Sequence, residues 1–128
     1  MQHLEDLEQA ALFERLAWEL PDVLAFHIPN GGKRNALEAK RLKAQGVKPG
    51  VPDICIPMAR GGYHGLYIEL KRPIQDGKSG MGTRRCAPIS QAQELIIQRL
   101  REEGYYAIVC YGADGAFEVI KKYLKEQP

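Results

Sequence analysis

The sequence is poor in cysteine and has no long apolar run, and each absence excludes a class of protein. Its three cysteines, Cys55, Cys86 and Cys110, are far apart and form no CxxC pair, so we expect neither a disulfide framework nor a zinc cage. No stretch approaches the roughly 18 consecutive apolar residues of a membrane span. The first residues lack the basic start and apolar run of a signal peptide. We therefore expect a soluble, cytoplasmic protein with no membrane partner.

The chain also lacks the GxxxxGK[ST] loop that cradles nucleotide phosphates, so we expect no nucleotide cofactor. Its 128 residues are 45% hydrophobic and 27% charged, which excludes collagen-like and wholly disordered proteins. This composition predicts one compact domain over residues 1–128. Within it, residues 72–88 are rich in Gly, Lys, Arg and Ser, and we interpret them as a mobile basic loop.

The net charge of +2 conceals an uneven distribution. Residues 30–86 hold twelve Lys and Arg but four Asp and Glu, a net +8, which leaves −6 for the two flanks. A basic middle between acidic ends is typical of proteins that bind a polyanion. A solvated charged surface without a partner remains the alternative.

Hydrophobic periodicity and turn residues predict four helices and four strands. The helices are expected over 4–20, 33–45, 91–103 and 113–125, and the strands over 23–28, 53–57, 64–71 and 105–111. Strand 23–28 is expected to be buried, and Ser90 is expected to cap the third helix. This order predicts an α/β fold with a mixed β-sheet flanked by helices.

Two carboxylates and a lysine carry the sharpest chemical signal. Glu69 and Lys71 share one face of a predicted strand, and Asp53 opens the neighbouring strand of the same hairpin. Adjacent carboxylates repel unless a cation lies between them, and such oxygen ligands suit Mg²⁺ or Mn²⁺. A metal held there lowers the pKa of a bound water and neutralises charge on a phosphate, while Lys71 orients that water. The alternative is an exposed sheet face on which Glu69 and Lys71 merely pair across strands.

The spacing of Pro52-Asp53 and Glu69-Leu70-Lys71 resembles the PD-(D/E)xK nuclease superfamily. Further segments in the same order are similar to its VRR-NUC branch: 28–32, 46–53, 65–71, Ser90-x-x-Gln93 and Gly104-Tyr105. The resemblance implies a restriction-endonuclease-like core and a phage-type, stand-alone nuclease. It also implies a symmetric homodimer that cleaves Holliday junctions and leaves 5′-phosphate ends.

The resemblance further implies an acid on the first helix, a metal-binding carbonyl at Leu70 and a catalytic role for Gln93. Glu5, Glu8 and Glu14 compete for the position of the acid. At about 100° per residue Glu8 falls on the apolar arc of the helix, so we favour Glu8. The alternatives are that Glu8 is an ordinary surface glutamate and that Gln93 is a solvated helix residue.

Polar and basic residues in the middle of the chain are candidates for DNA contacts, because flexible amides and cations bind phosphates. The candidates are Asn30, Lys33, Arg34, Lys40, Arg41, Lys43, Lys78, Arg84 and Arg85. The alternatives are a plain turn for Asn30, Lys33 and Arg34, a solvated helix face for Lys40, Arg41 and Lys43, and a disordered connector for Lys78, Arg84 and Arg85. We expect His27 to be a core or rim residue rather than a ligand.

Together these features predict a Mg²⁺- or Mn²⁺-dependent, structure-selective DNA endonuclease. The expected metal ligands are Asp53, Glu69, Leu70 and Glu8, assisted by Lys71 and Gln93. The expected substrate is branched DNA, in particular a Holliday junction cut by a homodimer. A flap or nicking endonuclease and a non-cleaving DNA-binding module are the alternatives.

Overall fold

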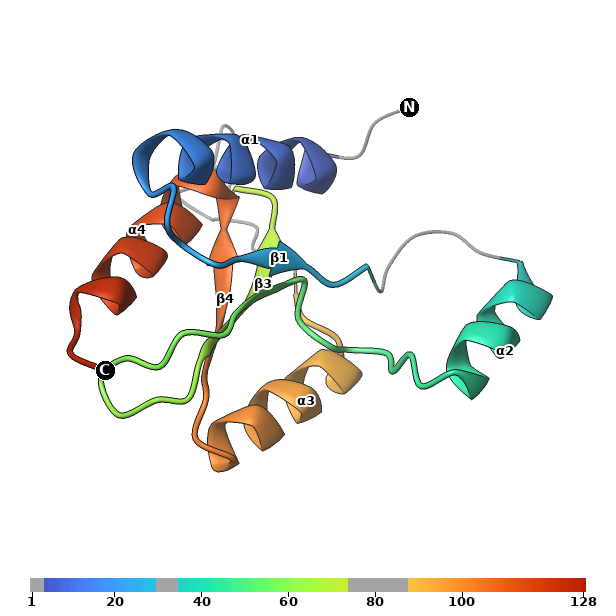
Figure 1. The fold of residues 1–128 in the computed structure, drawn as a ribbon. Helices are drawn as coiled ribbons and strands as arrows, with labels where there is room; N and C mark the ends of the chain where they lie inside the picture. The colour runs from blue at the N-terminus through green and yellow to red at the C-terminus, as the bar shows by residue number, and fades with distance from the viewer. Residues whose placement is uncertain (1–3, 30–34, 74–87) are drawn as a thin grey trace, which may run out of the picture.

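The computed structural model describes residues 4–29, 35–73 and 88–128 (Figure 1). The elements in chain order are α1 (Leu4–Glu19), β1 (Phe26–His27), α2 (Ala36–Ala44), β2 (Ile54–Ile56), β3 (Leu66–Lys71), α3 (Gln91–Glu102), β4 (Tyr106–Tyr111) and α4 (Gly112–Lys125). This is the predicted order of helices and strands, and the α/β fold is confirmed.

One mixed sheet organises the chain, with the strand order β1-β2-β3-β4. β1 pairs antiparallel with β2, and β2 pairs antiparallel with β3. β3 pairs parallel with β4, since α3 carries the chain back between them. In this register Ile54 lies opposite Ile68, which brings the residue before β2 to the end of β3.

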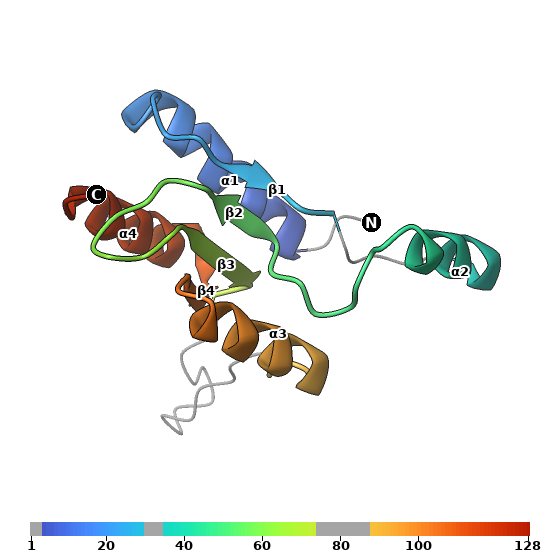
Figure 2. The ribbon, with the colours of Figure 1, turned by 60° about the horizontal axis from the view of Figure 1, so that its bottom comes forward.

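The two faces of the sheet carry different helices. Leu66, Ile68 and Leu70 of β3 are at most 2% exposed and belong to a hydrophobic core with residues of α1 and α4. α3 packs against β4, and Figure 2 shows it on the other side of the sheet from α1. Because side chains alternate along a strand, the residues between those three point away from this core.

The predicted buried strand 23–28 is shorter and more exposed than expected. β1 spans Phe26 and His27, and both side chains are exposed, Phe26 by 45%. The physical reason is its position at the edge of the sheet, where it pairs with β2 alone. The predicted helix 33–45 begins at Ala36 within the described residues, with Asn35 as its N-cap. Most of the predicted loop 72–88 lies outside the described residues.

α2 projects away from the rest of the fold (Figures 1 and 2). None of its residues is buried, and it packs against no other helix or strand of the described chain. Its cations Lys40, Arg41 and Lys43 are all exposed. No helix in the described part of the chain is long and apolar enough to cross a membrane.

Candidate active site

The antiparallel pairing of β2 and β3 brings Asp53 and Glu69 together. Asp53 comes directly before β2, and its Oδ2 accepts a hydrogen bond of 2.8 Å from the backbone nitrogen of Leu70. The two carboxyl groups hydrogen-bond to one another. Glu69 is 5% exposed and is the one charged residue that is buried among those described. The predicted pairing of these two acids is therefore present.

Burial governs the protonation of this acidic pair. Desolvation, followed by the negative charge of Asp53, raises the pKa of Glu69 to about 8. Burial also raises the pKa of Asp53, although the hydrogen bond from Leu70 and the contact with Glu69 act in the opposite direction. Without a cation, the acidic pair therefore keeps one proton at neutral pH. A cation beside the pair would displace that proton and relieve the desolvation cost.

Lys71 and Gln93 complete the polar cluster around Glu69. Lys71 Nζ lies 3.7 Å from Glu69 Oε2, and its side chain is 12% exposed. Gln93 Nε2 donates to the same carboxylate oxygen over 3.0 Å, and Gln93 Oε1 lies 3.5 Å from Lys71 Nζ. Gln93 thus contacts both residues of the predicted Glu69–Lys71 pair, rather than pointing into solvent.

The N-terminus of α3 fixes the position of Gln93. The Ser90 hydroxyl accepts from the Gln93 backbone nitrogen over 3.1 Å, and Ser90 N donates to Gln93 Oε1 over 2.8 Å. These two bonds form a capping box, so the side chain that caps the helix also touches Glu69. Gly50, with a φ of 92°, packs against this turn. A Cβ at Gly50 would overlap the Ala92 carbonyl and lie 2.8 Å from Gln93 N.

Glu8, the acid of α1 that helix periodicity favours, makes its hydrogen bond with α4. Glu8 Oε1 accepts a 2.7 Å hydrogen bond from Ala113 N, in the first turn of α4. Glu5 is the acid of α1 whose charge contributes to the raised pKa of Glu69. Glu14 is exposed. Glu8 is therefore bonded to α4, whereas the charge of Glu5 influences Glu69, and the choice of the acid of α1 stays a prediction.

The donor atoms fit a hard divalent cation. The described residues contain no group of three His, Cys, Asp or Glu side chains that could hold a metal. Two carboxylates are present, however, and the Leu70 N–H points to Asp53, so the Leu70 carbonyl leaves β3 on the same side. Oxygen donors of this kind suit Mg²⁺ or Mn²⁺, which complete their coordination with water and phosphate oxygens.

Comparisons with known proteins agree with this geometry. A family model described as the VRR-NUC domain matches residues 4–114. A solved structure titled "VRR_NUC domain protein" is 32% identical, with a TM-score of 0.76 over 99% of this chain and 93% of that one. The chain belongs to the VRR-NUC family. No curated protein matches it. Membership in this nuclease family confirms the resemblance found in the sequence and agrees with an acidic pair at the end of β3.

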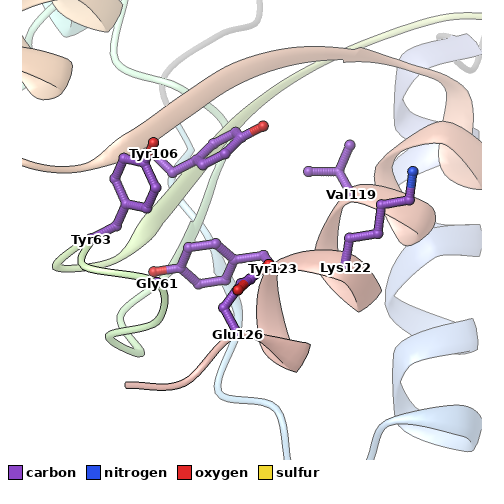
Figure 3. Close-up of a pocket in the computed structure, with 7 residues that line it drawn as sticks. All are labelled: Gly61, Tyr63, Tyr106, Val119, Lys122, Tyr123 and Glu126. Atoms are coloured by element: carbon purple, nitrogen blue, oxygen red, sulfur yellow. The ribbon is translucent and has the colours of Figure 1, made fainter.

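A cavity elsewhere in this VRR-NUC fold is separate from the acidic pair. It has a volume of about 530 Å³ and lies between Tyr63, Tyr106 and the α4 residues Val119 and Tyr123 (Figure 3). Tyr106 pairs with Leu66, at the opposite end of β3 from Lys71. The cavity therefore contributes no residue to the candidate site.

The three predicted DNA-binding residues that the structure describes do not lie around the acidic pair. Lys40, Arg41 and Lys43 lie on the projecting helix α2, ten residues or more before Asp53 in the chain. The other six, Asn30, Lys33, Arg34, Lys78, Arg84 and Arg85, lie outside the described residues. Their role in this VRR-NUC chain stays a prediction.

Sequence reasoning missed the contact of His27 with the site. His27 Nδ1 lies 2.9 Å from the backbone oxygen of Asp53, and the side chain is exposed rather than part of the core. The His27 ring also acts on Asp53 electrostatically, in the direction that lowers the pKa of the Asp53 carboxyl group. This contact follows from the pairing register of β1 and β2, which could not be predicted from the sequence.

Proposed function

We propose that this VRR-NUC chain is a metal-dependent, structure-selective DNA endonuclease, carried by a single domain over residues 1–128 and acting in the cytoplasm. The observation that carries the proposal is the pair of the buried Glu69 and the half-buried Asp53 beside Lys71. Placing a second acid in contact with the buried Glu69 costs folding free energy, and this pair does not stabilise the fold in exchange. A divalent cation and the phosphate that it binds would offset that cost.

Mg²⁺ or Mn²⁺ would be held by Asp53, Glu69, the Leu70 carbonyl and an acid of α1, Glu5 or Glu8. When bound, such an ion lowers the pKa of a water and neutralises charge on the scissile phosphate. Lys71 supplies a positive charge next to Glu69, where it stabilises the developing negative charge and orients the attacking water. Gln93 holds Glu69 and Lys71 in register through its two contacts.

The preferred substrate is branched DNA, most specifically a Holliday junction. The exposed cations of α2, Lys40, Arg41 and Lys43, together with the basic residues outside the described ranges, would neutralise backbone phosphates. The described residues of each chain offer one such acidic pair, so cutting two opposed strands requires two chains. A homodimer with two-fold symmetry matches the symmetry of a four-way junction.

A substrate panel tests this proposal. Labelled four-way junction, 5′ flap, 3′ flap and linear duplex are incubated with the protein in Mg²⁺, Mn²⁺ or EDTA. We expect paired cuts in the junction with either metal and none in EDTA. Cleavage of flaps or single nicks would favour the flap or nicking endonuclease. Binding without cleavage under every condition would leave a DNA-binding module.

Mixed dimers test whether each chain cuts one strand. Wild-type chains are combined with Glu69→Ala chains that carry a different affinity tag, and doubly tagged dimers are isolated. We expect these dimers to nick one strand of a junction but fail to resolve it. Full resolution by mixed dimers, or a monomeric wild-type protein on its substrate at micromolar concentration, would contradict the resolvase proposal.

A further inference from the structure

The edge strand β1 holds the peptide of Asp53 with both a backbone group and a side chain. Ile28 N donates to the Asp53 carbonyl oxygen over 2.6 Å, and His27 Nδ1 lies 2.9 Å from the same oxygen. A carbonyl oxygen can only accept a hydrogen bond, so His27 carries its proton on Nδ1 in this contact.

Asp53 is also held from the opposite neighbour, β3. Leu70 N donates to Asp53 Oδ2 over 2.8 Å. The peptide of Asp53 is thus fixed from β1 and its carboxylate from β3. A rotation of the Asp53 peptide would break bonds on both sides, so the carboxylate has one well-defined direction, toward Glu69.

The β1 side is the weaker of the two supports. β1 has two residues at the edge of the sheet, with both side chains exposed, whereas β3 has six residues and pairs on both sides. Short edge segments with few buried contacts open at low free energy. The hydrogen bond from the His27 side chain therefore supplements the few backbone hydrogen bonds between β1 and β2, and it does so at Asp53.

We propose that His27 is a positioning residue for Asp53, whose Nδ1–H holds the Asp53 peptide on β1 so that the carboxylate stays beside Glu69 when a divalent cation binds. This inference rests on the proposed metal-dependent function. Mutation of a residue that hydrogen-bonds a metal ligand typically lowers metal affinity or activity by about 10- to 100-fold. Because His27 acts through Asp53, its loss is expected to weaken metal binding rather than the reaction at saturating metal.

Three substitutions of His27 separate its two ring nitrogens. His27→Asn places an amide near the position of Nδ1, His27→Gln places one near Nε2, and His27→Ala removes both. Mn²⁺ affinity is measured by calorimetry on the protein without DNA, and cleavage is measured against Mn²⁺ concentration. His64→Ala is the matched control, since His64 is an exposed histidine whose ring packs against Tyr105.

We expect His27→Ala and His27→Gln to weaken Mn²⁺ binding about tenfold or more, with cleavage at saturating Mn²⁺ within about threefold of wild type. His27→Asn and His64→Ala are expected to bind Mn²⁺ like the wild type. Unchanged affinity in His27→Ala overturns the proposal. Rescue by Gln instead of Asn overturns the assignment to Nδ1.

The nitrogen NMR spectrum of the metal-free protein tests the contact separately from the proposed function. We expect the ring of His27 to be the Nδ1–H tautomer, and an Nε2–H tautomer would overturn the inference whatever the metal data give. A wild-type protein that neither binds Mn²⁺ nor cuts DNA would instead refute the proposed function. The tautomer then decides by itself whether His27 holds the Asp53 peptide.

Discussion

Replacing Glu69 with glutamine should make the metal-free protein more stable at neutral pH. Glu69 is buried and its pKa is raised to about 8, so its protonated form is the one that fits the fold. A glutamine amide can donate to Asp53 as the protonated acid does, while its oxygen still accepts from Gln93 Nε2. The substitution therefore keeps the hydrogen bonds and removes the ionisable proton.

The size of the effect follows from the linkage between protonation and folding. The folded pKa of Glu69 lies above its unfolded value of 4.5, so the stability it contributes is complete below about pH 4.5 and is lost as the pH rises through 8. Each pKa unit corresponds to about 1.4 kcal/mol. Raising the pH from 5 to 7 should therefore cost the wild type on the order of 2 kcal/mol more than Glu69→Gln.

Urea denaturation in EDTA at pH 5 and pH 7 measures this difference. Glu102→Gln is the control, because it makes the same chemical change at an exposed position near the end of α3. Adding Mg²⁺ at ten times its Kd should return about 1.4 kcal/mol to the wild type at pH 7 and nothing to Glu69→Gln. The reasoning is refuted if Glu69→Gln differs from the wild type equally at both pH values, or is less stable at pH 7.

Three further predictions concern the surroundings of the acidic pair. Gly50→Ala should reduce cleavage at least tenfold while the protein still folds, because the added Cβ displaces the first turn of α3 and with it Gln93; cleavage and circular dichroism measure the two effects. Glu8→Ala should lower the free energy of unfolding by about 1 kcal/mol through loss of the cap on α4, whereas Glu5→Gln should weaken Mn²⁺ binding without lowering stability. Lys71→Ala should abolish cleavage and keep junction affinity within about threefold in a binding assay, since many other cations contribute to binding.

The pattern of the sequence predicts most of the architecture, because each helix and strand has its own local signal. Gly46 and Gly104 end two predicted helices, and both have positive φ in the structure, 103° and 96°. Ser90 caps α3 as predicted, and Gln93 is its partner in the capping box. β1 departs from the prediction because an apolar run identifies a strand but not its place at the edge of a sheet.

The contacts of the site are less predictable than its residue types. The spacing of Asp53 and Glu69 predicts that they meet, because a hairpin register follows from alternation along two strands. Helix periodicity instead favours Glu8, which lies on the inner arc of α1 but binds the N-terminus of α4. That contact depends on where α4 begins relative to α1, 105 residues away in the chain. The contact of His27 could not be predicted for the same reason, since its partner is the backbone oxygen of Asp53, 26 residues away in the chain.

The topology explains why the chemistry gathers at one end of β3. A hairpin places the start of β2 beside the end of β3, which delivers Asp53 to Glu69. A parallel pair requires a crossover, which here includes α3, and the first turn of α3 brings Gln93 to Glu69 at the same end of β3. β4 then continues directly into α4, whose N-terminus reaches α1 through Glu8. Strand ends and the first turn of a helix therefore position Asp53, Glu69 and Gln93.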